Sequence, residues 1–350
     1  MKPFRLTLLL LCVVLGKSSF HAQAQEKVEA VWDASFDLFF DNREYHSPFT
    51  PSQTLFGLRL APEIGIRFDQ DHSIMTGINF LAEFGAHPGV EAKDYIAYYQ
   101  YKGKRLSCYG GLIPRAKSIA SYTRAIFNDS IYYYAPILSG LLLQYKGESG
   151  YVEFGLDWNS KITNTDREKF LLFLGSRFHI HSFYAGLQAS LYHHSQTLLY
   201  DGVVDNMLLF PHIGLDLAET TRFERFNVQA GWMQAFQNDR TFVGKYVSPS
   251  GLQLDVSLQK WRIGIDNTLY AGQNLMPYWE APARNYDYGP GLYWGEPFYR
   301  TDSIYNRMEL YWQPHIGDRF FLRLSSVHHY DGHCWSWQQK LRFVVNLGKN

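Results

Sequence analysis

Apolar and polar residues alternate one by one along several stretches of the chain. The stretch 335–347 shows it best, because its odd positions are nearly all aromatic or aliphatic and its even positions nearly all polar. The stretches 32–38, 56–68, 151–159 and 252–259 repeat the pattern. Neighbouring side chains of a β-strand point to opposite faces, so each stretch predicts a strand with one apolar and one polar face.

The segments between these strands come in two sizes that alternate along the chain. Seven short turns and eight longer links separate about sixteen strands. Short turns at one end and long loops at the other are typical of a transmembrane β-barrel, whose closed ladder satisfies every backbone group in lipid. A soluble sandwich would alternate too, but its turns would not sort by length. We therefore predict an all-β fold: a transmembrane, antiparallel, up-and-down β-barrel of about 16 strands.

The N-terminus carries the pattern of a secretion signal. Two basic residues precede an apolar stretch at 6–16, and Ala22–Ala24 offers a small-x-small cleavage site. We expect residues 1–24 to be a removed signal peptide. Residues 25–350 would then form a single outer-membrane β-barrel domain.

Composition excludes several classes of protein. The 350 residues carry zero net charge, which argues against nucleic acid as a partner. Hydrophobic residues make up 46%, so the chain is not disordered, yet no apolar run of membrane-helix length follows the first 25 residues. The 17% aromatic content suits two girdles at the membrane interfaces. Cys108 and Cys334 lie too far apart in sequence to decide whether they pair.

The signal, the alternating strands and the aromatic-apolar last strand resemble Gram-negative outer-membrane β-barrel proteins of the porin-like kind. The resemblance covers the whole chain after the signal and is architectural. It implies the cell outer membrane as location, outer-membrane lipid and the outer-membrane assembly machinery as partners, and a homo-oligomer as one option. In that class the last strand commonly ends in an aromatic residue, whereas here the pattern closes at Leu347.

The polar faces of the strands carry charges of both signs. Barrel closure would put Asp33 and Asp37 beside Lys340 and Arg342, either as stripes that orient solutes or as pairs that hold the seam. We favour pairing, at roughly 0.2–1 kcal/mol for each cross-strand pair. The pore-lining candidates are Asp33, Asp37, Arg59, Glu63, Arg67, Arg307, Glu309, Arg323, Lys340 and Arg342.

The longest link, Gly272–Asp302, is rich in aromatic residues and proline. It would narrow the pore from inside, present aromatic faces to a sugar or other exterior ligand, or cap the barrel mouth. We favour constriction, because we expect only this link to be long enough to enter the barrel. The constriction or ligand-contact candidates are Tyr278, Trp279, Tyr286, Tyr288, Tyr293, Trp294, Phe298 and Tyr299.

Catalytic and metal chemistry have weaker support. The histidines at 193–194 and 328–333 match no metal-site spacing, so we expect solvated loop histidines, no metal and no cofactor. A lipid hydrolase would need a Ser and a His near the membrane surface. Ser182, Ser190 and Ser195 lie near histidines in sequence, but Gly-x-Ser-x-Gly is absent. We assign no catalytic residue and keep the hydrolase as a minor alternative.

The sequence thus predicts an outer-membrane pore for passive or weakly selective passage of small polar solutes. The alternative is a surface-exposed binding or structural barrel with an occluded lumen, whose aromatic loop 272–302 engages a glycan or protein partner. Whether the lumen is occluded distinguishes the two.

Overall fold

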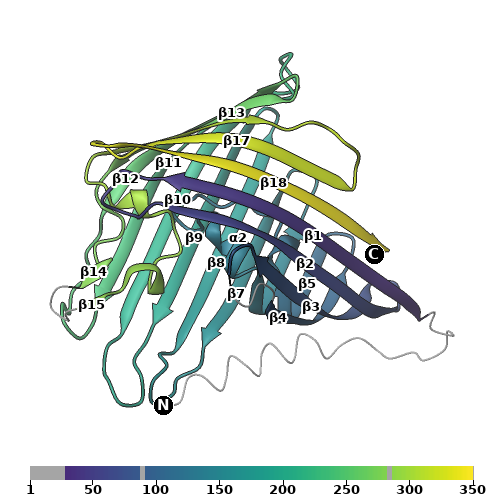
Figure 1. Cartoon of the computed structure of the whole chain (residues 1–350), viewed down its shortest axis with the longest axis horizontal. Coiled ribbons are helices and arrows are strands. Elements are labelled where there is room, and N and C mark those ends of the chain that lie inside the picture. Colours follow the sequence, from purple (N-terminus) through teal and green to yellow (C-terminus); the bar gives the residue numbers. More distant parts are fainter. Residues whose placement is uncertain (1–27, 87–90, 282–285, 350) are drawn as a thin grey trace.

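Sixteen strands close into one antiparallel barrel, in which β1 (Glu29–Glu44) pairs with β18 (Trp335–Lys349). The computed structural model describes residues 28–86, 91–281 and 286–349, so the expected signal peptide lies outside the described residues. In Figure 1 the C-terminal end of β18 lies beside the start of β1. The predicted barrel and its strand number are confirmed. Within the described ranges, no helix has the length and apolar character needed to cross a bilayer.

The remaining barrel strands follow one another around the ring in sequence order. They are β2 (Gln53–Phe68), β3 (His72–Glu83), β4 (Glu91–Lys102), β5 (Leu106–Pro114), β6 (Ile137–Lys146), β7 (Gly150–Ser160), β8 (Lys169–Ile180), β9 (Phe183–His194), β10 (Val204–Asp216), β11 (Arg225–Asp239), β12 (Ser250–Lys260), β13 (Ile263–Gly272), β16 (Ile304–Trp312) and β17 (Phe320–Tyr330).

Two of the long links carry structure of their own. The β5–β6 link contains η2 (Arg115–Lys117) and α2 (Ser130–Tyr134). The β13–β16 link contains a two-stranded sheet and two 3-10 turns. These are β14 (Glu280–Ala281), β15 (Tyr286–Asp287), η4 (Gly289–Gly291) and η5 (Pro297–Arg300). Both links belong to the same end of the barrel, called here the long-loop end; the other is the short-turn end.

Side-chain exposure alternates along the strands as the sequence pattern predicts. On β12, Leu252 and Leu254 are exposed, whereas Gln253 between them is buried. Exposed leucines on a barrel wall face lipid, because a soluble surface would not gather them in a continuous belt. Six tryptophans near strand ends are also exposed, as membrane girdles require: Trp32, Trp158, Trp261, Trp312, Trp335 and Trp337. Trp232 is exposed as well, at the middle of β11.

The seam between β1 and β18 carries some of the expected charge pairing. Arg342 donates to Asp37 at 2.8 Å, which confirms cross-strand pairing at that position. Asp33 and Lys340 instead bind side chains inside the barrel, Lys117 and Asp129. Neither Cys108 nor Cys334 is in a disulfide.

The inward face is wet in one half of the barrel and packed in the other. Gln253 is only 3% exposed and bonds to Tyr299 and Thr123 of two inward-folded links. Ser257, farther toward the short-turn end of the same strand, lines a cavity of about 380 Å³. Gln253 lines the same cavity but also contacts both inward-folded links, so the two positions share a face and differ in how closely other side chains pack on them.

A pair of substitutions on β12 tests which face of the strand meets lipid and which meets the lumen. Leu254→Arg should cost roughly 2–4 kcal/mol of unfolding free energy, because it places a guanidinium at the lipid side of mid-strand. Ser257→Arg should cost less than about 1 kcal/mol, because its cavity is wet. Urea titration of both variants folded in vesicles measures the difference. Equal losses would mean that the faces are assigned wrongly.

Candidate functional site

Two links fold into the barrel and meet inside it. We call residues 115–136 the first insertion and residues 273–303 the second insertion. The expectation that only the second link could enter the lumen is wrong, because the first insertion crosses it as well. The sequence could not show that these residues enter the lumen, because the side chains that bind them lie on strands distant in sequence.

The first insertion begins against one side of the barrel. Glu153 of β7 accepts from the Ser118 hydroxyl at 2.6 Å, the Ile119 amide at 2.7 Å and the Tyr122 hydroxyl at 2.9 Å. The approach is close at Gly175 of β8, where a Cβ atom would lie 2.6 Å from that of Ala120. A side chain at this position would push the insertion off the wall.

The first insertion ends against the opposite wall through Asp129. This carboxylate binds Lys340 of β18 at 2.5 Å and Arg124 of its own insertion, and Arg307 of β16 lies 3.9 Å away. Burial alone would raise the pKa of Asp129, but Arg124, Lys340 and Arg307 hold it well below its ordinary value. Asp129 therefore stays ionised and ties the insertion across the lumen.

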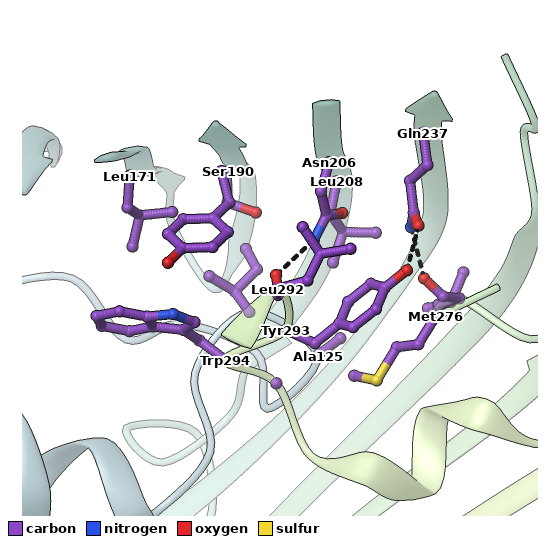
Figure 2. A pocket seen from close by; sticks show the side chains of 14 residues that line it. Ala125, Leu171, Ser190, Asn206, Leu208, Gln237, Met276, Leu292, Tyr293 and Trp294 are labelled. Carbon is purple, nitrogen blue, oxygen red and sulfur yellow. Dashed lines mark hydrogen bonds between the residues drawn. The ribbon is translucent and has the colours of Figure 1, made fainter. Parts of the chain in front are cut away.

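The second insertion packs on β10, β11 and β12. Figure 2 shows Asn206 donating to the Leu292 carbonyl at 3.0 Å and Tyr293 donating to Gln237 at 2.6 Å. Tyr299 donates to Gln253 at 2.6 Å. The space left around these contacts is only about 30 Å³, roughly the share of one water.

The two insertions also bind each other. Backbone amides of Asn128 and Glu296 donate to Trp294 and Arg124 carbonyls at 2.8 and 2.7 Å. Gly295 lies so close to the first insertion that a Cβ atom would sit 2.1 Å from the Ala125 carbonyl oxygen. We call the joined insertions the plug. It fills the long-loop half of the lumen over the residues that the structure describes.

The aromatic candidates of the longest link are mostly core residues of the plug. Tyr288, Tyr293, Phe298 and Tyr299 are buried, and Tyr278, Trp279 and Trp294 pack partly buried against them. Tyr286 lies in β15, and its side chain falls outside the described residues. Buried rings cannot offer their faces to an exterior sugar, so these residues form the packed core of the plug.

The short-turn half of the lumen holds three adjoining cavities of about 360, 380 and 310 Å³. Tyr132 of α2 lines all three. All but one of the predicted pore-lining residues line one of them: Asp33, Asp37, Arg59, Glu63, Arg307, Glu309, Arg323, Lys340 and Arg342. Arg67 lies half-buried at the short-turn end of β2.

A row of polar side chains crosses the lipid-facing wall, which the sequence analysis did not single out. Thr54 donates to Asn42 at 2.7 Å, and Asn42 donates to Gln339 at 2.8 Å. Gln339 lies opposite Ser326 in the β17–β18 ladder. We call these four residues the wall row. Phe40, Leu341 and Leu324 form the next row toward the membrane centre.

Ser326 of the wall row is paired with a histidine. Its hydroxyl lies 3.1 Å from Nε2 of His328, two residues along the same face of β17. Within the described part of the chain, this is the one hydrogen bond between a serine side chain and a histidine ring. A nucleophile hydroxyl within reach of a base is the arrangement that acyl transfer needs.

The other histidines and serines considered from the sequence play different parts. His329 is buried between Tyr305 and Gln338, at 2.9 and 3.2 Å, so it is not a solvated loop residue. His193 stacks on Phe170, with ring centroids 4.8 Å apart. Ser190 lines the small space under the plug. Sequence proximity grouped His328 with His329, although strand alternation sends them to opposite faces.

Comparison with known proteins identifies one matching family and a set of solved outer-membrane β-barrel structures with a similar fold. The family described as Lipid A 3'-O-deacylase-type matches residues 27–316, a segment that ends before β17. A loop L8 deletion mutant of the Vibrio cholerae outer membrane protein OmpT has a TM-score of 0.56 at 7% identity, over 93% of this chain and 100% of that one. Pseudomonas aeruginosa OccK2 (OpdF) has a TM-score of 0.52 at 8% identity, over 91% and 98%. At such identities the likeness shows the fold alone, and no curated protein matches significantly.

The anchor of the first insertion can be tested at Asp129. Asp129→Asn should speed amide exchange in residues 115–136 at least about tenfold, because it leaves buried cations without their carboxylate. Glu148→Gln, at an exposed turn carboxylate, is the matched control. Acidification of the wild type to pH 5 should not loosen the insertion. A carboxylate with a lowered folded-state pKa loses its stabilising effect only as the pH falls through that value. Unchanged exchange in Asp129→Asn would refute the anchor.

Proposed function

The chain belongs to the Lipid A 3'-O-deacylase-type family, and we propose that it hydrolyses an acyl ester of a lipid A-type glycolipid in the outer leaflet. The observation that carries the proposal is the Ser326–His328 pair on the lipid-facing wall. The plug supports it indirectly, because a packed long-loop half leaves the wall as the surface that an outer-leaflet lipid can reach. The family match thus gives weight to the hydrolase that the sequence alone left as a minor alternative.

The depth of the pair suits a lipid ester. Trp337 is exposed, pairs with both His328 and Glu44 in the ladders, and belongs to the aromatic girdle at the headgroup level. Ser326 lies one ladder pair deeper, above the apolar row of Leu324. Acyl esters of a glycolipid lie between the sugar heads and the hydrocarbon, which is this level.

The chemistry assigned to the site is acyl transfer to serine and then to water. The Ser326 hydroxyl oxygen attacks the ester carbonyl carbon while His328 Nε2 takes its proton. The sugar alkoxide leaves as the C–O bond breaks and receives that proton from His328. Water, deprotonated by His328, then attacks the acyl-serine carbonyl carbon; the bond to the Ser326 oxygen breaks, that oxygen takes the proton back from His328, and the fatty acid is released. Gln339 accepts from Asn42 at its Oε1 and lies opposite Ser326 in the ladder, so its side-chain amide is the candidate oxyanion donor.

Barrel closure brings the parts of this site together. Asn42 and Thr54 lie within the matched segment, on β1 and β2. Ser326, His328 and Gln339 lie beyond it, on β17 and β18. The wall row spans the seam between the two ends of the chain, so the site exists only in the closed barrel.

Fatty-acid release from a lipid A-type glycolipid tests the pair. Ser326→Ala and His328→Gln should each slow release about 100-fold or more, because each removes one half of the nucleophile–base pair. Ser176→Ala, at another hydroxyl on the lipid-facing wall, should keep the wild-type rate. Mass spectrometry of glycolipid in reconstituted vesicles measures the loss of an acyl chain. A wild type that releases nothing would refute the hydrolase, and an active Ser326→Ala would refute the pair.

A second candidate function is passage of small polar solutes, favoured by the charged cavities of the short-turn half. The plug separates them from the long-loop end, so passage would require the plug to move. This candidate corresponds to the pore interpretation of the sequence, with the lumen closed at rest.

Conductance distinguishes a closed barrel from an open pore. Replacing 273–300 alone with a short Gly/Ser linker should change single-channel current little, because the first insertion still crosses the lumen. Replacing 116–135 as well should raise the current strongly, since porins of this strand number keep a wide channel. Circular dichroism checks that both variants keep the barrel. A wild type that conducts like the doubly replaced barrel would contradict the plug.

A further inference from the structure

We propose that the short-turn half of the lumen is a binding site for a small organic dianion. The inference goes beyond the proposed lipid chemistry and concerns the opposite side of the barrel wall. Its centre is the cavity of about 310 Å³ under α2. Water occupies about 30 Å³ in the liquid, so the cavity holds a solute of about ten water volumes, such as a dicarboxylate.

The cavity has more positive than negative charge. Six cations and four carboxylates line it or pair directly with a side chain that does. The cations are Arg124, Arg225, Arg307, Arg323, Lys340 and Arg342, and the carboxylates are Asp37, Asp129, Asp266 and Glu309. The chain as a whole has zero net charge, so this excess of two positive charges is local.

Three of the four carboxylates, Asp129, Asp266 and Glu309, are each shared between two or more cations. Asp266 already binds Arg225 at 3.1 Å and Arg323 at 2.7 Å. Glu309 binds Arg307 at 2.8 Å and Arg323 at 3.0 Å, and it also accepts from the Ser325 hydroxyl at 2.7 Å. Shared carboxylates leave guanidinium donors to face the cavity, and a wall of one sign in a low-dielectric cleft attracts the opposite ion.

Two arginines are accessible to an incoming ligand. The side chains of Arg225 and Arg342 are 47% and 40% exposed, although both line the cavity. The planar guanidinium fork matches a carboxylate or phosphate in two parallel hydrogen bonds. Arg342 uses Nε and one terminal nitrogen on Asp37, and Arg225 uses one terminal nitrogen on Asp266. An anion with two acidic groups would bind the donors that remain and neutralise the local excess.

A second observation points the same way in the adjoining cavity. Arg59 lines that cavity, is only 7% exposed, and its two terminal nitrogens have no hydrogen-bond partner among the described residues. A buried guanidinium without a partner is costly, so the native site should supply one. Arg342 and Tyr132 line both cavities, so Arg59 lies in a space that adjoins the central cavity.

The ligand would enter from the short-turn end. The plug closes the other side, where Phe298, Tyr299 and Tyr305 are fully buried. In an outer-membrane barrel the short turns face the periplasm. The site would therefore sample periplasmic solutes, while the lipid-facing wall samples the outer leaflet.

Titration calorimetry of the folded, detergent-solubilised protein tests the proposal with four probes: succinate, inorganic phosphate, glucose and putrescine. Succinate should bind, and the neutral and dicationic probes should not. Phosphate binding would extend the class to small dianions in general, whereas succinate alone would narrow it to dicarboxylates. Raising the salt concentration should weaken binding, because the attraction is screened. Failure to bind either anion, or equal binding of glucose or putrescine, would overturn the proposal.

Variants connect the binding to these residues. Arg225→Gln and Arg342→Gln should each weaken succinate binding about tenfold or more, because each removes a charge-assisted pair. Arg342→Lys keeps the positive charge but not the planar guanidinium, so its succinate affinity should lie between those of the wild type and Arg342→Gln. Arg105→Gln removes the same charge at an exposed turn and should bind like the wild type. Folding of each variant is checked by circular dichroism. Unchanged affinity in folded Arg225→Gln and Arg342→Gln would refute the site, whatever the lipid assay shows.

Discussion

Closure of the hydrogen-bond ladder between β1 and β18 is the constraint on which the rest of the molecule depends. In lipid an unpaired backbone group costs several kcal/mol, so a strand edge cannot be left open. Closing the ring joins residues about 300 apart in sequence, such as Asp37 and Arg342 or Asn42 and Gln339. Both the wall row and the charged cavities include side chains from each end of the chain.

Sixteen strands impose a second requirement, because a ring of that size leaves a lumen too wide for wall side chains to fill. The chain fills the long-loop half with two insertions and leaves the other half hollow. Charged contacts such as Asp129–Lys340 tie the first insertion to the wall, and aromatic packing around Phe298 holds the second. The inward side chains therefore face either the packed plug or the hollow short-turn half, and the outward side chains face lipid.

Strand alternation lets these environments coexist on the same elements. His328 reaches the lipid-facing wall, whereas His329 is buried under the plug beside Tyr305. The same backbone can thus carry lipid chemistry outside and anion recognition inside without shared side chains. Each of the two proposals can fail without the other, because they use opposite faces of the wall.

The sequence by itself determined the barrel, its strand number and the direction in which most strand side chains point. Period-two alternation and the ordering of short and long links are local properties, and a closed ring is the way such strands satisfy their backbone in lipid. It also identified Arg323, Lys340 and Arg342 as inward charges. Only the tertiary structure decided that 115–136 enters the lumen, since Glu153 and Lys340, which hold it, lie on opposite walls. The Ser326–His328–Gln339 grouping needed the strand register as well, because a shift of one residue would send each side chain to the other face.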